Sequence, residues 1–195
     1  MRVRHGVMRL GIVIPGLLVV ACATSEPAIL VGLLYAPPKN LTAMPPSVVV
    51  HLSPVVDARS DPEAIGHTTV IVRATSDVLA WVREGLLTLG EQGYELSMSG
   101  SDPPEGFRLR VTVTRVYCRS VVNSLRSSVV LVVEYFRGGE LVAKRQHRGE
   151  STYQDMGLFS GTYRFNEARV LQVLNDGLGN AVAQIAATLK ELGGG

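Results

Sequence analysis

The sequence predicts a two-layer α+β domain, in which two amphipathic helices cover one face of a mostly antiparallel sheet. Strand-length segments with alternating apolar and polar residues predict the sheet, and two segments with apolar residues three and four positions apart predict the helices. The expected element order is β-α-β-β-β-β-α, a pattern that favours a two-layer sandwich. With 195 residues and 46% hydrophobic content, the chain is long enough to form one such domain around a buried core.

We place this domain at residues 47–192, followed by a glycine tail at residues 193–195. Its first strand is the β-branched run Val48–Leu52. Residues 55–62 become polar and are interpreted as the end of a strand and a loop. Residues 67–72 (HTTVIV) are expected to form a short edge strand.

The first helix is expected to start after Thr75, Ser76 and Asp77, which are residue types that cap helix N-termini. Gly93 is expected to end it. The strand at residues 94–98 follows. The apolar stripe of this helix consists of Val78, Leu79, Val82, Leu86 and Leu89.

Three consecutive strands follow a turn at residues 99–106. Residues 107–118 alternate between apolar and polar side chains, which is typical of a half-buried strand. Residues 129–136 are apolar on both faces, so this strand is expected at the centre of the sheet. A two-glycine hairpin turn at residues 137–140 leads to residues 141–152, a charged strand expected near an edge.

The last helix is expected to start after Asn166, which can cap it, and to run to about Leu192; a loop at residues 154–164 precedes it. Gly177 and Gly179 lie within the helical pattern, where they predict close helix packing or a bend. The apolar stripe consists of Val170, Leu171, Leu174, Leu178, Val182, Ile185 and Leu189.

The N-terminus resembles the signal peptide of bacterial lipoproteins. Basic residues at positions 2, 4 and 9 precede the apolar segment at residues 10–21, which is shorter than the ~20 residues of a membrane-spanning helix. The sequence Val19-Val20-Ala21-Cys22 is similar to a lipobox. This resemblance implies cleavage after residue 21, diacylglycerol on the sulfur of Cys22 and a fatty acid such as palmitate on its amino group.

The same resemblance implies a location in the bacterial envelope. Residue 23 is Ala rather than the Asp that usually retains such proteins in the inner membrane, so we expect a lipid anchor in the outer membrane with the domain facing the periplasm. Residues 22–46 are expected to form a proline-rich tether. Within them, the apolar run at residues 28–35 could add an edge strand or pack against the domain.

Charge and cysteine content exclude some classes of function. The formal charge of +2 becomes −1 when the signal segment, with three arginines and no acid, is removed, so the sequence provides no electrostatic argument for a nucleic-acid partner. Cys118 would then be the single free thiol; it is interpreted as a small strand residue, with a reactive or intermolecular thiol as the alternative. His51, His67 and His147 lack the spacing of metal ligands and are interpreted as surface or strand histidines. We therefore expect no catalytic residues, no metal site and no cofactor.

Asp57, Arg59, Asp61 and Glu63 form the densest charge cluster of the chain. One interpretation is a binding or catalytic loop beside the sheet edge, for which Asp57, Arg59 and Asp61 are the candidate residues. The other is a solvated loop with local pairing between aspartate and arginine, because two carboxylates near an arginine are too common to identify a reaction.

The order of several segments resembles the YajG family of uncharacterised bacterial outer-membrane lipoproteins. The resemblance covers nearly the whole chain after Cys22 and implies no catalytic residues. It rests on the lipobox, the valine-rich strand that leads to Asp57-Ala58-Arg59, Gln92-Gly93-Tyr94, Leu109-Arg110-Val111-Thr112-Val113 with Tyr117, the hairpin at Gly138-Gly139, and Val173-Leu174-Asn175-Asp176.

Together these observations predict a non-enzymatic protein that is attached to the membrane through lipid on Cys22 and binds an envelope protein or supports the envelope. Two alternatives stay open. One is an auxiliary lipoprotein of a lipid or lipopolysaccharide transport system, an analogy that rests on the predicted fold. The other is a hydrolase that uses the loop at Asp57.

Overall fold

The computed structural model describes residues 27–37, 48–98, 106–121, 124–154 and 166–194. The predicted signal peptide, Cys22, residues 99–105 of the predicted turn and residues 155–164 of the predicted loop lie outside these ranges. The elements are β1 (Ala28–Val31), β2 (Val48–Leu52), β3 (Val56–Asp57), β4 (Ala64–His67), β5 (Ile71–Ala74), α1 (Val78–Leu87), the short 3-10 helix η1 (Gly90–Gln92), β6 (Tyr94–Ser97), β7 (Gly106–Val121), β8 (Ser124–Arg137), β9 (Glu140–Gln154) and α2 (Glu167–Gly193).

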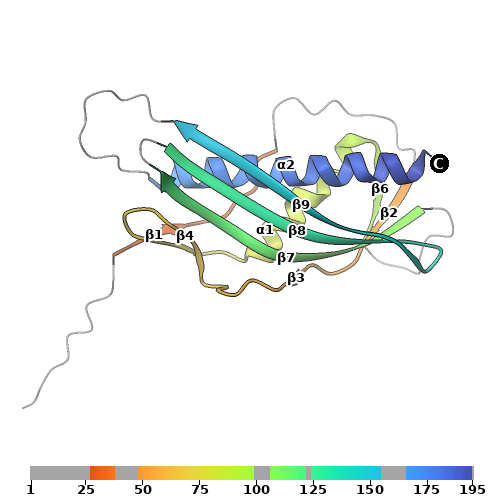
Figure 1. The fold of residues 1–195 in the computed structure, drawn as a ribbon, viewed down its shortest axis with the longest axis horizontal. Helices are drawn as coiled ribbons and strands as arrows, with labels where there is room; N and C mark the ends of the chain where they lie inside the picture. The colour runs from red at the N-terminus through yellow and green to blue at the C-terminus, as the bar shows by residue number, and fades with distance from the viewer. Residues whose placement is uncertain (1–26, 38–47, 99–105, 122–123, 155–165, 195) are drawn as a thin grey trace, which may run out of the picture.

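Three long antiparallel strands, β7, β8 and β9, lie side by side and form one side of the sheet, which ends at β9 (Figure 1). β8 lies between β7 and β9, as its apolar character on both faces predicts. Gly138 and Gly139 form the turn between β8 and β9 with φ angles of 57° and 85°, values that glycine adopts without strain. The predicted central strand, hairpin and charged edge strand are therefore confirmed.

Short strands line the other edge of β7. β2, β3 and β4 pair with it in parallel, one after another along its length. β6 adds to β2, while β5 and then β1 add to β4. The predicted element order did not include these parallel pairs. Three short strands share β7 as their partner, and no hairpin joins any of them to it in the sequence.

The predicted edge strand at residues 67–72 is wrong in its boundaries. The structure has two antiparallel strands here, β4 and β5, with a turn at residues 68–70. The backbone N–H of Thr68 donates to the carbonyl of Val70 at 2.9 Å and closes this turn. The β-branched run favours extended backbone locally, but pairing with β7 and β1 on either side requires the chain to reverse.

Both helices begin at the predicted caps. The Asp77 side chain accepts a hydrogen bond from the Leu79 N–H at 2.8 Å, and the Asn166 side chain accepts one from the Arg169 N–H at 3.1 Å. After α1 and η1, Gly93 takes the left-handed conformation with φ of 91°, which ends the helical segment. α2 extends to Gly193, the first residue of the predicted glycine tail.

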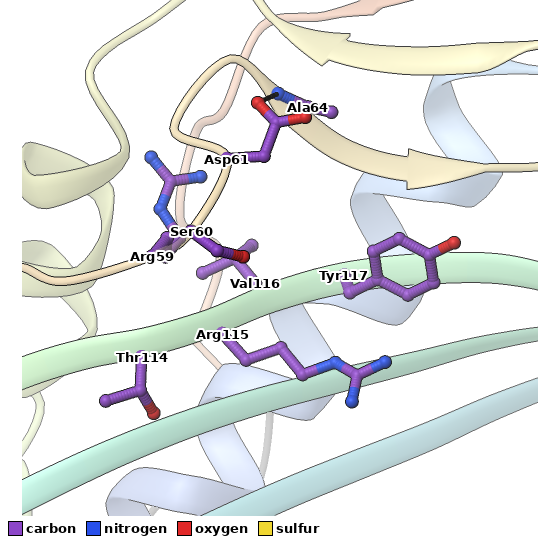
Figure 2. Close-up of a pocket in the computed structure, with 8 residues that line it drawn as sticks. All are labelled: Arg59, Ser60, Asp61, Ala64, Thr114, Arg115, Val116 and Tyr117. Atoms are coloured by element: carbon purple, nitrogen blue, oxygen red, sulfur yellow. Dashed lines mark hydrogen bonds between the residues drawn. The ribbon is translucent and has the colours of Figure 1, made fainter.

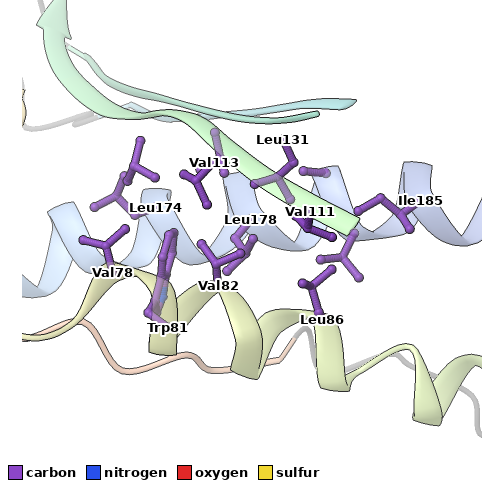
Figure 3. Close-up of a cluster of buried hydrophobic side chains, with 14 of the residues drawn as sticks. Val78, Trp81, Val82, Leu86, Val111, Val113, Leu131, Leu174, Leu178 and Ile185 are labelled. Atoms are coloured by element: carbon purple, nitrogen blue, oxygen red, sulfur yellow. The ribbon is translucent and has the colours of Figure 1, made fainter. Parts of the chain in front are cut away.

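The two helices lie on the same face of the sheet and enclose the core between them and the strands (Figure 3). The apolar stripes predicted for both helices are buried, apart from Leu79 and Leu171, which are half-buried. The architecture is therefore the predicted α+β two-layer arrangement. The largest buried side chains are Trp81, Tyr135, Phe107, Ile65, Leu86, Leu89, Leu109, Leu125, Leu131, Leu174, Leu178 and Ile185.

Glycines allow α2 to approach β9 closely. A Cβ atom on Gly149 of β9 would overlap the carbonyl of Gly177 and the backbone nitrogen of Ala181, and a Cβ on Gly177 would lie 2.7 Å from the hydroxyl of Ser127. Backbone therefore packs against backbone at this point. The prediction that Gly177 marks close helix packing is confirmed.

Polar side chains of α2 also satisfy the free edge of β9. The Gln184 amide accepts a hydrogen bond from the Arg148 N–H at 3.2 Å and donates to the Arg148 carbonyl at 2.8 Å. One helical turn earlier, the Asn180 amide donates to the carbonyl of Glu150 at 2.8 Å. These bonds use backbone groups that an unprotected edge strand would offer to another sheet.

The N-terminal segment is bonded into the fold rather than lying beside it. β1 is an edge strand beside β5, and Val31 and Leu33 are buried in the core. The Trp81 indole N–H donates to the Asn175 side chain at 2.8 Å, and the Asn175 amide donates to the carbonyl of Leu34 at 3.0 Å. Of the two interpretations of residues 28–35, the added edge strand applies to residues 28–31 and packing against the domain applies to Leu33.

A buried polar pair lies between the sheet and α2. The hydroxyl of Tyr135 and Nε2 of His147 are 2.7 Å apart. Burial, and secondarily the positive charge of Arg145, lowers the pKa of His147. His147 is thus a strand residue, as predicted, but its side chain is turned into the core.

We predict that Gly149→Ala lowers the free energy of unfolding by about 3 kcal/mol, because the added methyl group overlaps the backbone of α2 and the helix must move away. Urea denaturation would measure the change. Gly193→Ala is the matched control, since the nearest atom to its added Cβ is a ring carbon of Phe107 at 4.0 Å. Equal stability of the two variants would contradict the role of this contact.

We also predict that His147 makes the protein less stable as the pH falls from about 7 to about 5. The unfolded histidine takes up a proton near its ordinary pKa, whereas the folded one, with its lowered pKa, stays neutral until lower pH, so the unfolded state is favoured. The slope should not exceed about 1.4 kcal/mol per pH unit. It should be smaller in His147→Gln, as measured by urea denaturation at each pH; parallel curves for the two proteins would contradict the prediction.

Candidate functional site

One face of the sheet carries the helices, and the opposite face is here called the open face. The register of β7, β8 and β9 places alternate residues of each strand on it. Arginine is the most frequent residue type among them. The residues of the open face on the three strands include Arg108, Arg110, Arg115, Tyr117, Arg119, Arg126, Ser128, Val130, Glu134, Lys144, Arg148, Glu150 and Thr152.

The sequence-predicted loop lies beside this face, between β3 and β4. Asp57 and Arg59 form a two-pronged ion pair, with distances of 2.9 Å from Nε to Oδ1 and 2.8 Å from Nη2 to Oδ2. Arg59 also donates to the carbonyl of Pro62 at 3.0 Å. The hydrogen bonds from the Arg59 side chain lower the pKa of the Asp57 carboxyl group. The pair therefore holds the loop in shape.

Asp61 has a different partner. Its carboxylate accepts hydrogen bonds from the backbone N–H groups of Glu63 and Ala64, both at 3.1 Å, and so forms the turn that leads into β4. Glu63, the fourth member of the cluster, forms an exposed ion pair with Arg73 at 2.7 Å. The structure thus brings Asp57 and Arg59 into contact and uses Asp61 separately.

A pocket of about 410 Å³ lies between this loop and β7 (Figure 2). Its lining residues are Arg59, Ser60, Asp61, Ala64, Thr114, Arg115, Val116 and Tyr117. The Arg59 side chain is 5% exposed, and its Nη1 atom is buried without a hydrogen-bond acceptor among the residues that the structure describes. This nitrogen is a polar group that a ligand in the pocket could satisfy.

A second pocket of about 290 Å³ adjoins the first and shares Arg115 and Tyr117 with it. Its other lining residues come from β7, β8 and β9, and include Arg119, Arg126, Ser128, Arg148 and Glu150. Arg115 lies over the ring of Tyr117, 5.1 Å from its centre. Arg148 forms an ion pair with Glu150 at 2.6 Å.

Sequence reasoning missed the arginines of this second pocket. The alternation in β7 predicts that Arg108 and Arg110 share a face with Thr112, but the overall charge of the chain is close to neutral. Only the pairing of β7 with β8 and β9 brings arginines from three strands together. The sequence did contain a signal for this cluster, because arginine recurs at the polar positions of the strands. The nearly neutral total charge does not reveal it.

Cys118, His51 and His67 do not line these pockets. Cys118 is fully buried beside its register partner Gly66, and burial raises the pKa of its thiol to about 12, so the thiolate that reacts is scarce at neutral pH. Cys118 is thus a small strand residue, as predicted, rather than an accessible thiol. His67 is exposed at the end of β4, and His51 is half-buried in β2.

Within the described ranges, no group of three or more histidine, cysteine or acidic side chains is arranged to hold a metal ion. None of the helices in this part of the chain combines the length and apolar character needed to cross a bilayer.

The architecture is similar to that of known structures, although no family model and no curated protein matches the sequence. A crystal structure of a Xanthomonas campestris protein of the family DUF330 is similar with a TM-score of 0.53 and 10% identity, over 84% of this chain and 94% of that chain. A minor lipoprotein from Acinetobacter baumannii gives a TM-score of 0.44 and 16% identity, over 73% and 91% of the two chains. The first likeness shows a shared fold, and membership of the YajG family stays a prediction.

We predict that Asp57→Ala destabilises the protein by about 1–3 kcal/mol, because it leaves the buried guanidinium of Arg59 without its main acceptor. Thermal unfolding followed by circular dichroism would measure the loss. Glu63→Ala removes a carboxylate of the same loop whose partner is exposed, and should cost less than about 1 kcal/mol. Equal costs for the two variants would show that the pair at Asp57 does not hold the loop.

Proposed function

We propose that the chain is a lipid-anchored protein of the bacterial envelope that binds a component of the envelope through the open face of its sheet, without a catalytic role. The lipobox that ends at Cys22 carries the proposal. This motif predicts a specific chemical modification, diacylglycerol on the sulfur of that cysteine. The anchor in the outer membrane and the orientation toward the periplasm are part of the same proposal.

The way the chain enters the fold supports this anchor. Ala28 begins β1 only six positions after Cys22, and six residues span at most about 20 Å. The Gly32 N–H donates to the Glu167 side chain at 3.0 Å, and the Leu33 N–H donates to Ser76 Oγ at 2.7 Å, so the entry segment is tied to both helical regions. Such a short segment would hold the domain close to a membrane, whereas a long flexible linker would not.

The partners of the charged loop residues favour binding over catalysis. The Asp57 carboxylate accepts hydrogen bonds from Arg59, and the Asp61 carboxylate accepts them from two backbone N–H groups. Both carboxylates therefore stabilise the conformation of the loop. A general base needs a carboxylate that faces its substrate. The two adjoining pockets instead offer arginine side chains, which are donors with a fixed charge.

We predict that Cys22→Ser abolishes incorporation of labelled palmitate and releases the protein from the membrane fraction, because the acyl chains provide the anchor. Metabolic labelling and cell fractionation would measure both effects. Cys118→Ser is the control, since Cys118 is buried and should keep full labelling. Palmitate on the Cys22→Ser protein, or a native chain that mass spectrometry finds intact from Met1 and without acyl groups, would overturn the proposal.

A further inference from the structure

Four cations of the open face lie at one end of the sheet, in two cross-strand rows. Arg115, Val130 and Arg148 form one row, and Arg119, Arg126 and Thr152 form another. Glu150 of the row between them pairs with Arg148. Among the described residues of β7, β8 and β9 on this face, the other acid is Glu134, which lies farther along the strands and pairs with Arg110 and Lys144.

Arg119 and Arg126 have no acidic partner among the residues that the structure describes. They are directly opposite each other on β7 and β8, so their Cβ atoms are about 5 Å apart, and like charges in this position disfavour the sheet. On its other side Arg119 has His67 of β4 as its register partner. Neither arginine forms an ion pair with any part of the chain that the structure describes. An arrangement with this cost is explained if an anion binds between the two guanidinium groups.

The pocket between these rows has an unsatisfied donor at its floor. Ser128 is 9% exposed, and its Oγ atom is buried with no hydrogen-bond partner among the described residues. A hydroxyl group and planar guanidinium groups that converge on one pocket suit the oxygens of a phosphate group. The site therefore fits a phosphate ester better than an apolar ligand.

This end of the sheet is also the end at which the chain enters the fold (Figure 1). β1, β5 and β4 lie side by side next to the last residues of β7, so β1 is about 14 Å from Arg119 across the sheet. In β1, Ile29 and Val31 face the core, which places Leu30 on the open face, where it is 56% exposed. Leu34, three residues after β1, is 68% exposed.

We propose that this arginine-rich end of the open face binds the phosphates of anionic phospholipid headgroups in the membrane that carries the anchor. The inference rests on the proposed anchor at Cys22, whose tether keeps β1 within about 20 Å of the bilayer. Arginines and exposed leucines at the same end of the domain, about 14 Å apart across the sheet, match a surface that lies against an anionic membrane, with cations at the phosphates and apolar side chains in the interface. An acidic protein partner could also bind the arginines, but such a partner would not account for the exposure of the two leucines.

The test measures how close this face lies to the bilayer. The processed protein carrying Gln154→Cys would be labelled with a fluorophore at that exposed position beside the arginines, while Cys118 is buried and Cys22 is acylated. After incorporation into vesicles with an acceptor dye on the lipid headgroups, energy transfer reports the contact. Transfer should be high in vesicles of phosphatidylcholine with phosphatidylglycerol, and low in phosphatidylcholine alone or in concentrated potassium chloride.

Charge variants identify the residues. Arg119→Ser with Arg126→Ser should reduce the population held against the phosphatidylglycerol vesicles by roughly tenfold. Arg83→Ser with Lys190→Ser changes the net charge equally, but on the exposed surfaces of α1 and α2, and should leave the transfer unchanged. Circular dichroism would verify that each protein is folded, and the lipid and salt comparisons require no arginine variant.

The outcomes separate this inference from the proposed anchor. A chain that does not float with the vesicles refutes the anchor. A chain that floats, but whose energy transfer is the same with both lipid compositions and after substitution of Arg119 and Arg126, refutes the headgroup site and leaves the anchor intact. Crosslinking of the open face to an acidic protein, with the transfer unaffected by lipid charge, would also overturn it.

Discussion

The backbone contact between α2 and β9 at Gly149 and Gly177 sets the geometry on which the rest of the structure depends. Because neither residue has a side chain, the long helix lies directly on the sheet, and its amides reach the edge of β9 at Arg148 and Glu150. The same approach brings the apolar stripe of α2 into the core, against the buried side chains of the sheet. Burial of that stripe supplies much of the driving force for folding, and the glycines decide at what distance it occurs.

Because both helices lie on one face of the sheet, the other face is exposed to water. Arginines concentrate on this exposed face, although the chain as a whole is nearly neutral. Arginines that are scattered in sequence become neighbours through the register of three strands. On the half of the open face that lies away from the chain entry, Glu134 pairs with Arg110 and Lys144. On the half beside β1, Arg119 and Arg126 have no such partner within the described ranges. A total charge therefore says little about a surface on which one sign is concentrated.

Local chemistry explains why part of the candidate site could be predicted. Asp57, Arg59 and Asp61 are close in sequence, and their partners lie within three residues, so the charge pattern alone indicated a structured loop. The second pocket could not be predicted from such local charge patterns. Ser128 and Arg148 meet Arg115 only because β8 and β9 pair with β7, and the unsatisfied Oγ of Ser128 is a property of that packed arrangement.

The sequence by itself determined the elements whose signals are local: both helices with the caps at Asp77 and Asn166, the hairpin at residues 138–139, and the central position of the apolar strand β8. The lipobox likewise depends on adjacent residues and needs no fold. Tertiary structure alone decided that β2, β3 and β4 share the edge of β7, that the run at residues 67–72 contains a chain reversal, and that His147 turns into the core beside Tyr135. These features arise from contacts between residues distant in sequence, whose energies no short window of residues contains.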